Sequence, residues 1–337
     1  MESVLSQGKL PADLLAAILA RAPVDDPRVL LGPGIGLDCA VVDAGERLLV
    51  LKSDPITFAS DELGYYLVQV NANAIATTGG VPRWLLVTLL LPAGRATTAM
   101  AETVMEQIYG ACRDMGVAVV GGHSEISDGV NRPIALGALV GEVDRERLIT
   151  PRGARPGDRV LLTKGVPIEA TSILAREFPE RLAGHLSEDE LQQARDFLTD
   201  PGIGVLHDAR VAQGAGRVTA MHDPTEGGLV TALWELAQAS GRRLRVDPER
   251  VPIPALSRRV CRAFAMDPYH SIASGALLLT APAEDAECIR QALLSEAIPC
   301  ALIGSVEQGP VGVQRPAEAG WQTWSAPGVD EITKAYQ

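Results

Sequence analysis

The sequence predicts a two-domain protein of the α/β or α+β class. Its 337 residues suffice for two domains of ordinary size. Extended apolar runs alternate with helical patterns in both halves of the chain, which is typical of sheets packed against helices. Between the halves, the segment TPRGARPGD at residues 150–158 is rich in Arg, Gly and Pro and has no apolar periodicity. We therefore predict domains at residues 1–152 and 153–337.

The first half is predicted to form a mixed sheet with helices. A leading arm and short helix occupy residues 1–24, where Leu14, Leu15, Ile18 and Leu19 follow helical spacing. Residues 96–116 form the clearest amphipathic helix, because apolar side chains recur there at three- and four-residue steps. The other elements predicted in this half are strands within residues 28–54, a helix at 63–78, a strand at 82–92 and strands at 117–122 and 133–143.

The second half shows the same interleaving of strands and helices. Strands are predicted at RVLLTK (159–164), VTAM (218–221), GALLLT (275–280) and IPCALIGSV (298–306). Helices are predicted near residues 168–177, 188–199 and 203–213, from Asp223 onward and through Cys288. No repeat of 20–50 residues and no low-complexity segment is visible.

Composition and charge exclude several classes of protein. The net charge of −12 argues against non-specific nucleic-acid binding, although a small anion such as a nucleotide can still bind locally. No apolar run reaches the ~18–20 residues that span a bilayer. The N-terminus has no basic region followed by an apolar stretch, so we expect no secretory signal and a cytoplasmic protein. The five cysteines lie far apart without a CxxC pair, which predicts buried, reduced thiols and no zinc site.

The glycine run GPGIG at residues 32–36 is not a dinucleotide fingerprint. That fingerprint needs the spacing GxGxxG between a strand and a helix, whereas a strand-like run follows here. No GxxxxGK[ST] phosphate loop occurs either. Taken alone, GPGIG is a turn, and a nucleotide would have to bind by another route.

Two acids lie at the ends of apolar β segments, Asp38 and Asp54. A buried acid needs a cation or hydrogen-bond donors, and a Mg²⁺–phosphate cluster would satisfy both. The alternative is that each caps a turn. Lys52, beside Asp54, and Lys164, after RVLLT, are the best candidates for binding phosphate, although lysine is more commonly a solvated surface residue.

The segment GGHSEISD at residues 121–128 combines glycines with ionisable side chains. Gly121 and Gly122 permit a close approach of the backbone to a ligand. Histidine is the side chain whose ordinary charge change falls near physiological pH, so for His123, with Ser124 and Glu125 beside it, a role in proton transfer is as plausible as a structural one.

The segment HDPTEGGL at residues 222–229 reads as a helix start. Asp223 fits the N-cap position, Pro224 the first helical position, and Glu226 completes a capping box. Capping does not explain Gly227 and Gly228, each of which costs ~1 kcal/mol relative to alanine within a helix. Glycine at this place either exposes backbone NH groups to an anion or allows tight packing.

These segments, with VNANAIATTGG at residues 70–80, resemble one superfamily in order and spacing. It contains aminoimidazole ribonucleotide (AIR) synthetase, the hydrogenase maturation factor HypE, thiamine-monophosphate kinase and selenophosphate synthetase. The resemblance covers nearly the whole chain and is closest to the HypE-like, AIR-synthase-related group. It implies a PurM-like fold, in which N-terminal mixed sheets pair into a dimeric β-barrel and the C-terminal domain is an α/β sandwich.

The resemblance also implies ATP and Mg²⁺ as cofactors. It places Asp38 and Asp54 at the metal, and His123 or Glu125 in proton transfer. The HDPTEGGL segment resembles one that faces the catalytic cleft in HypE-like relatives. The residues that the resemblance assigns to nucleotide binding are Lys52, Asp54, Asn71, Asn73, Gly121, Gly122, Ser124, Asp223, Thr225, Gly227 and Gly228.

The chain departs from the family pattern in ways that leave two hypotheses. Leu37 and Ala74 stand where the family usually carries acids, and no cysteine follows Cys300, which argues against HypE's own reaction with the acceptor in cis. In the first hypothesis, the protein uses ATP to phosphorylate an amide, thioamide or carbonyl oxygen in a biosynthetic or metalloenzyme-maturation step. In the second, the site has lost catalysis and the protein is a nucleotide-binding or scaffold partner in a maturation complex. The resemblance further implies a homodimer, a small-molecule or protein-borne substrate and a maturation partner.

Overall fold

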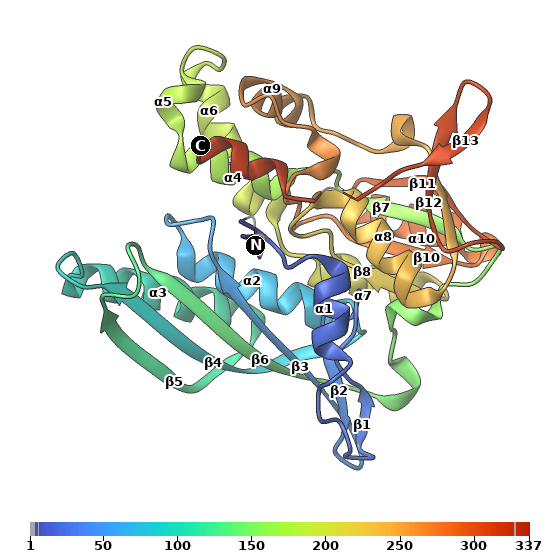
Figure 1. Ribbon diagram of the computed structural model, residues 1–337, viewed down its shortest axis with the longest axis horizontal. Coiled ribbons are helices and arrows are strands. Elements are labelled where there is room, and N and C mark those ends of the chain that lie inside the picture. Colours follow the sequence, from blue (N-terminus) through green and yellow to red (C-terminus); the bar gives the residue numbers. More distant parts are fainter. Residues whose placement is uncertain (1–3, 6, 327) are drawn as a thin grey trace. The chain divides into compact units, whose positions relative to one another are not determined.

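The computed structural model describes residues 4–5, 7–326 and 328–337 and divides into two compact units. The N-terminal unit comprises Asp25–Gly32 and Asp38–Leu148. The C-terminal unit comprises Ile149–Gln337 together with Pro33–Leu37 and the arm that ends at Val24. The predicted interleaving of strands and helices is confirmed in both units (Figure 1). The sequence did not indicate that the arm and residues 33–37 group with the second half.

The N-terminal unit is built on a six-stranded mixed sheet in the order β1-β2-β3-β6-β4-β5. β4 and β5 pair in parallel, and the other neighbours are antiparallel. Figure 1 shows α2 and α3 on one face of this sheet, which we call the inner face. The elements are β1 (Val29–Leu31), β2 (Ala40–Asp43), β3 (Leu48–Ile56), α2 (Leu63–Ala76), β4 (Val81–Pro92), α3 (Thr98–Met115), β5 (Ala118–Ser127) and β6 (Ile134–Val143).

α2 is a core helix that lies very close to the sheet. Of its 14 residues, 13 are buried. Glycines allow this approach: a Cβ atom on Gly141 of β6 would lie 2.5 Å from the Ile75 side chain. On the opposite side of α2, a Cβ on Gly64 would lie 2.8 Å from the backbone nitrogen of Ile108 in α3. The small residues of α2 and β6 therefore determine how deeply polar α2 side chains are buried against the sheet.

The other face of this sheet, the outer face, is apolar and is not covered by any helix of the described N-terminal unit. Leu51, Trp84 and Leu86 point outward by strand alternation and are 37%, 38% and 43% exposed. Such a contiguous apolar face is typical of an interaction surface.

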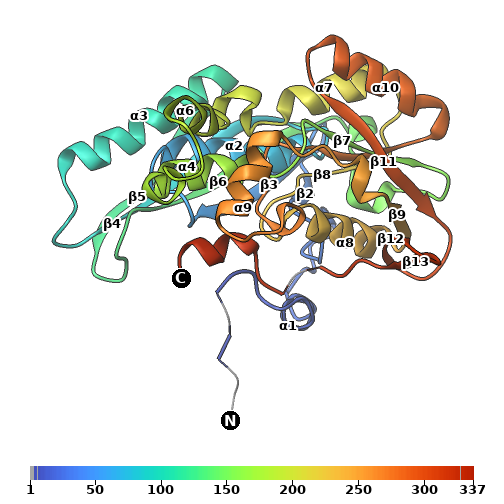
Figure 2. The same ribbon diagram turned by 90° about the horizontal axis from the view of Figure 1, so that it is seen from above.

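The C-terminal unit contains a seven-stranded sheet in the order β13-β12-β9-β11-β7-β10-β8. Only the β12–β9 pair is parallel among these neighbours. α8 packs on a core of Leu, Val and Ala from one face of the sheet, while α7 and α10 lie together on the other (Figure 2). The strands are β7 (Arg159–Thr163), β8 (Ala220–His222), β9 (Arg243–Val246), β10 (Leu278–Ala281), β11 (Cys300–Glu307), β12 (Gly312–Ala317) and β13 (Gly320–Thr323).

The helices of the C-terminal unit are mostly short. No described helix of the chain is long and apolar enough to cross a membrane. The α-helices are α1 (Ala12–Leu19), α4 (Ile168–Glu177), α5 (Pro179–Leu182), α6 (Glu188–Asp196), α7 (Leu206–Ala215), α8 (Gly228–Ser240), α9 (Ala255–Ala263) and α10 (Ala283–Ser295). The single-turn helices, one of them in the N-terminal unit, are η1 (Arg145–Arg147), η2 (Pro151–Gly153), η3 (Leu198–Gly202), η4 (Pro248–Arg250), η5 (Pro268–His270) and η6 (Glu331–Ala335).

Most predicted elements are confirmed, but three details are wrong. The strand predicted at 117–122 continues to Ser127, and the helix predicted from Asp223 begins at Gly228. The cysteines are all free, as predicted, yet Cys288 is exposed, because it lies on the solvent side of α10. The strands β9, β12 and β13 and the helix α9 were not predicted.

Candidate functional site

In the N-terminal unit, Lys52 and Asp54 form an ion pair on the inner face of β3. Alternation along the strand places both side chains on that face, and Ser53 on the other. The Lys52 Nζ lies 3.1 Å from Asp54 Oδ2, with the lysine side chain 13% exposed and the carboxylate 33% exposed. The pair is therefore sheltered but open to solvent at the carboxylate, so a ligand can reach it.

Asn71 of α2 fixes the backbone behind this pair. Its amide is fully buried, and Nδ2 donates to the Leu67 carbonyl at 2.9 Å and to the Asp54 carbonyl at 3.4 Å. Gly137 of β6 is the register partner of Asp54, and a Cβ there would lie 2.8 Å from Asn71 Nδ2. Sequence reasoning missed Gly137. The available signal was a pair of glycines, Gly137 and Gly141, inside an apolar strand.

Ala74 lies where the family pattern has an acid, and it is buried in the structure. It is 1% exposed, and its carbonyl oxygen accepts a hydrogen bond from the Cys39 thiol at 3.1 Å. Asp38, next to Cys39, is partly buried two residues before β2, and Asn73 is fully buried on α2. An acid at position 74 would therefore lie next to the segment that carries Asp38, and alanine supplies no oxygen ligand there.

The donor set of this unit fits a Mg²⁺ ion that arrives with ATP rather than a resident one. Mg²⁺ typically takes one or two carboxylates and completes its shell with phosphate oxygens and water. Asp54 offers a partly exposed carboxylate, but Lys52 already neutralises part of its charge. Without an acid at position 74, a metal bound to the protein alone would have few ligands, so a nucleotide would have to supply several.

The segment GGHSEISD forms most of β5, an edge strand that is exposed along nearly its whole length. His123 Nε2 and Glu125 Oε2 lie 3.5 Å apart, and both side chains are more than half exposed. The register pairs His123 with Thr88 and Glu125 with Leu90, which places both on the outer face. Within this unit, the structure thus separates them from Lys52 and Asp54, which lie on the inner face.

Gly122 is required by the packing of β5 on β4. It has φ +145°, and a Cβ there would overlap the Val87 carbonyl, lying 2.6 Å from its carbon. Gly121 has a similar φ of +154°, but a Cβ there would meet only the Leu86 side chain at 3.5 Å. Ser124 follows on the inner face, paired with Leu89. The need for glycine at 122 is therefore explained by the strand pair, without a ligand.

In the C-terminal unit, the predicted capping box of HDPTEGGL is wrong. α8 begins at Gly228, its N-cap is Gly227 with φ +85°, and no side chain of the segment caps it. Because β8 continues to His222, the chain needs the five residues Asp223–Gly227 to turn before the helix can start. We call these five residues the pre-α8 turn. Gly228 NH donates to Thr225 O at 2.9 Å, and Gly227 NH donates to the carboxylate of Asp330.

Close packing accounts for both glycines of the turn. A Cβ on Gly228 would lie 2.6 Å from the Tyr269 carbonyl oxygen, and one on Gly227 would lie 2.8 Å from Thr231 Cβ. Of the two explanations for a glycine pair, the structure supports tight packing, since both NH groups have acceptors within the chain. The roles of Asp223, Thr225, Gly227 and Gly228 at a nucleotide remain predictions.

Buried ionisable groups surround the pre-α8 turn. His222, 1% exposed, shares a hydrogen bond of 2.9 Å with Glu235, whose other oxygen lies 3.2 Å from Lys9 Nζ. Burial, opposed by the hydrogen bonds from Ser274 and aided by the nearby carboxylates of Asp330 and Asp223, raises the pKa of Glu169 to about 7. Such perturbed acids gather at functional sites more often than elsewhere.

Lys164 does not have either role that its sequence position suggested. Its side chain is 7% exposed, and Nζ donates to the Gly204 carbonyl at 2.6 Å and lies 3.2 Å from Asp208 Oδ1. It is neither a solvated surface lysine nor available to a phosphate. Lys164 directly follows the buried strand β7, which explains why its side chain is buried rather than solvated.

The family models decide the classification. The model described as "AIR synthase related protein, N-terminal domain" matches residues 36–143, and the corresponding C-terminal domain model matches residues 155–315. The chain belongs to the AIR synthase-related family. This confirms the predicted superfamily, and the two matches fall on the two units described above.

Related sequences of this family include proteins with names from hydrogenase maturation. A putative hydrogenase expression/formation protein of Methanocaldococcus jannaschii is 27% identical over 264 residues, which cover 75% of each chain. Carbamoyl dehydratase HypE of Cupriavidus necator is 27% identical over 261 residues, which cover 74% of this chain and 70% of HypE. A selenide, water dikinase of Photobacterium profundum is 28% identical over 250 residues, covering 72% and 68%. Identity alone therefore does not separate the branches of the family.

Solved structures confirm the fold. HypE in complex with ATP matches with a TM-score of 0.72 and 22% identity, covering 97% of both chains. The structure of a HypE–HypF complex matches with a TM-score of 0.73 and 17% identity, covering 93% of this chain and 99% of the other. The chain thus has the two-domain PurM-like α/β fold that the motifs predicted.

Proposed function

We propose that this protein is an ATP-dependent enzyme that activates an amide, thioamide or carbonyl oxygen by phosphorylation. The observation that carries the proposal is the part-exposed Lys52–Asp54 pair, whose backbone the buried Asn71 amide fixes. A lysine and a carboxylate side by side suit a phosphate group and its metal ion. Family membership and the solved structure of HypE in complex with ATP support the choice of ATP.

The reaction transfers the γ-phosphoryl group of ATP to the substrate oxygen. The bond from phosphorus to the bridging oxygen of ADP breaks, a bond to the substrate oxygen forms, and loss of phosphate then completes dehydration or ring closure. Lys52 would contact the phosphates, and Asp54 and Asp38 would hold Mg²⁺ and its water, with Asn71 and Asn73 orienting them. Bound Mg²⁺ would neutralise charge on the phosphates. His123 and Glu125 stay predicted candidates for moving a proton, although they lie on the outer face of the sheet and Lys52 and Asp54 lie on the inner face.

A second candidate function is nucleotide binding without turnover, which Ala74 favours because it removes a family acid. We expect purified wild-type protein with ATP and Mg²⁺ to release ADP. If it releases none, and Leu37→Glu/Ala74→Asp gains turnover, the degraded-site function replaces the first. The double variant inserts a carboxylate at a position 1% exposed, which costs about 3–5 kcal/mol unless a cation pairs with it. A rise in its melting temperature with Mg²⁺ would therefore report metal binding directly.

We further propose that a second copy of the chain covers the outer face of the N-terminal sheet. An exposed apolar face of Leu51, Trp84 and Leu86 suits an isologous interface, and family membership implies the paired-sheet barrel. Light scattering should give twice the mass of the chain. Leu86→Glu should shift it toward monomer, whereas Leu294→Glu on α10, at a similar exposure of 40%, should leave the dimer intact. A wild-type monomer at micromolar concentration would contradict this proposal.

We infer the cellular location and the partner of this protein from its relatives. We propose a cytoplasmic protein that works with a maturation partner, because HypE is found in complex with HypF. The substrate would be a small molecule or a group carried on that partner.

A further inference from the structure

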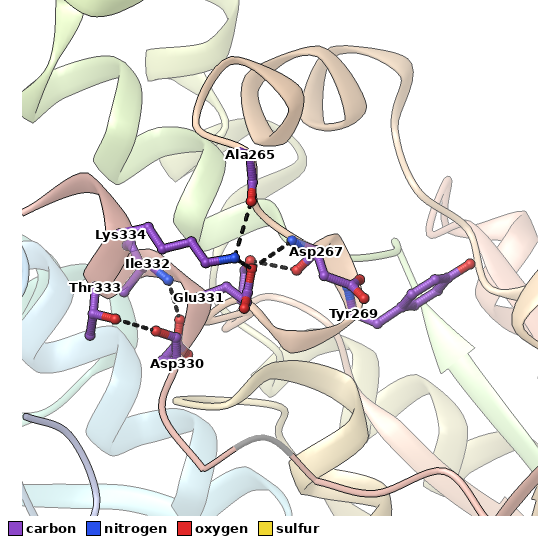
Figure 3. A network of polar contacts seen from close by, with 9 residues as sticks. Ala265, Asp267, Tyr269, Asp330, Glu331, Ile332, Thr333 and Lys334 are labelled. Carbon is purple, nitrogen blue, oxygen red and sulfur yellow. Dashed lines mark hydrogen bonds and ion pairs between the residues drawn. The ribbon is translucent and has the colours of Figure 1, made fainter. Parts of the chain in front are cut away.

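The C-terminal segment is docked firmly on its unit. Ile332 is fully buried, Ala335 is 6% exposed, and the Tyr336 ring meets Phe178 edge-on at a centroid distance of 5.0 Å. Glu331 accepts from the Asp267 NH at 3.0 Å and pairs with Lys334, which also donates to the Ala265 carbonyl (Figure 3). Polar and apolar contacts together hold the helix η6 in place.

Asp330, the residue before this helix, joins three segments of the unit. Its carboxylate is 3% exposed and receives three backbone NH groups. Oδ1 accepts from Ile332 at 2.8 Å, within its own segment, and from Ile272 at 3.2 Å, in the loop after η5. Oδ2 accepts from Gly227, which ends the pre-α8 turn. A carboxylate 103 residues away therefore accepts the NH of the N-cap residue, a role that the predicted capping box gave to Glu226.

The N-terminal arm reaches the same turn from the other end of the chain. The Lys9 NH donates to Glu226 Oε1 at 2.9 Å, and Lys9 Nζ pairs with Glu235, the partner of His222. Gly8 has φ +120°, and a Cβ there would lie 2.8 Å from Glu226 Oε1 and 4.0 Å from the Val329 side chain. Arm, turn and C-terminal segment thus meet at Glu226, although 217 residues separate Lys9 from Glu226.

We propose that Asp330 is a positioning residue that holds the pre-α8 turn in one conformation. Lys9 of the N-terminal arm binds the same turn from the other side of the sequence, and we call these two contacts together the clasp. The affinity for nucleotide depends on this clasp. This inference rests on the proposed ATP-dependent function and on the family resemblance, which predicts that Asp223, Thr225, Gly227 and Gly228 of the turn contribute to nucleotide binding. A turn with two glycines at positive φ has many conformations open to it, so an external anchor is needed to select one. Burying the carboxylate is costly, and three NH groups from separate segments offset that cost.

The test compares Asp330→Ala with Glu331→Ala, its neighbour. Both variants remove one carboxylate from the same segment, but only Asp330 touches the turn. We expect hydrogen exchange of the peptide spanning residues 222–229, without nucleotide, to quicken by about 10-fold or more in Asp330→Ala and to stay as in wild type in Glu331→Ala. ATP affinity should fall by a similar factor in the first variant alone.

The outcomes separate the clasp from the proposed function. Unchanged exchange in Asp330→Ala, or equal quickening in Glu331→Ala, would overturn the clasp. Quickened exchange with unchanged ATP affinity would overturn the positioning role. If wild-type protein binds no ATP, the proposed function fails, while the exchange experiment still judges the clasp. Should Asp330→Ala fail to melt cooperatively, Asp330→Asn replaces it. An amide in either orientation leaves at least one of Gly227, Ile272 and Ile332 without its acceptor, and that amide should exchange faster.

The pH dependence of hydrogen exchange at the turn is a second measurement, and a contact without a titrating carboxylate would not change it. Burial raises the pKa of Asp330 to about 6 against its three backbone hydrogen bonds. Protonation converts an acceptor oxygen into a donor, so wild-type exchange at the turn, corrected for intrinsic rates, should quicken as the pH falls through about 6. In Asp330→Ala the corrected rate should not change there. The other titratable groups near Asp330 or near its partners are Glu226, Glu331, Lys334, Asp267, His270, Cys261, Glu169 and Asp223.

Discussion

Replacing Asp54 by asparagine should weaken binding of ATP in the presence of Mg²⁺ by about 10–100-fold. Asparagine keeps the shape of the side chain and leaves the Asp54 backbone carbonyl that Asn71 holds unchanged. It removes the negative charge that would draw the metal ion, and a charge-assisted contact is typically worth ~1.5–3 kcal/mol. Calorimetric titration of the two proteins with ATP measures the difference.

The matched control for this experiment is Asp43→Asn. Asp43 lies on β2 of the same unit, pairs with Arg145 at 2.8 Å and has a side-chain exposure of 30%, close to the 33% of Asp54. The control also loses one negative charge from a part-exposed ion pair, so it reports any general effect of net charge. Equal losses in both variants would show that Asp54 has no special place in nucleotide binding.

Gly122→Ala should destabilise the N-terminal unit by about 3 kcal/mol or more, whereas Gly121→Ala should cost about 1 kcal/mol. Both glycines have φ near +150°, so both substitutions incur backbone strain. Only at Gly122 would the new Cβ overlap backbone, namely the Val87 carbonyl, and a β-strand cannot move aside without losing its ladder. At Gly121 the nearest atom is the end of the Leu86 side chain, which can rotate.

Denaturant unfolding followed by hydrogen exchange of β4 and β5 separates these two variants. Two units can unfold in two steps, so the transition must be assigned to the N-terminal unit before free energies are compared. Similar losses of stability in the two variants would mean that β5 can shift away from β4 at little cost in free energy, and would contradict this prediction.

Much of the fold could be predicted because periodicity is local. The strand Val81–Pro92, which is buried on one face only, and the amphipathic helix Thr98–Met115 follow directly from apolar spacing. The end of β5 could not be predicted in the same way. The glycine pair of GGHSE reads as a strand end, yet strand pairing with β4 carries it through to Ser127. Pairing between strands is a tertiary contact, and it overrides the local preference of glycine.

The candidate site was predictable in its residues but not in their arrangement. Alternation shows that His123 and Glu125 share one face of a strand, but only the register across β6 and β4 shows that Asp54 lies on the other face. The predicted start of α8 was wrong for a related reason. The local capping box competes with an acceptor 103 residues away, and no spacing rule reports Asp330.

The most direct test of the central claim, that the Lys52–Asp54 pair receives the phosphates of ATP, is a calorimetric titration with ATP and with AMP, each with and without Mg²⁺. We predict that ATP binds about 10-fold more tightly than AMP, or better, and that removing Mg²⁺ or introducing Asp54→Asn abolishes most of this difference. Equal affinities for ATP and AMP, unaffected by Mg²⁺ and by Asp54→Asn, would contradict the account.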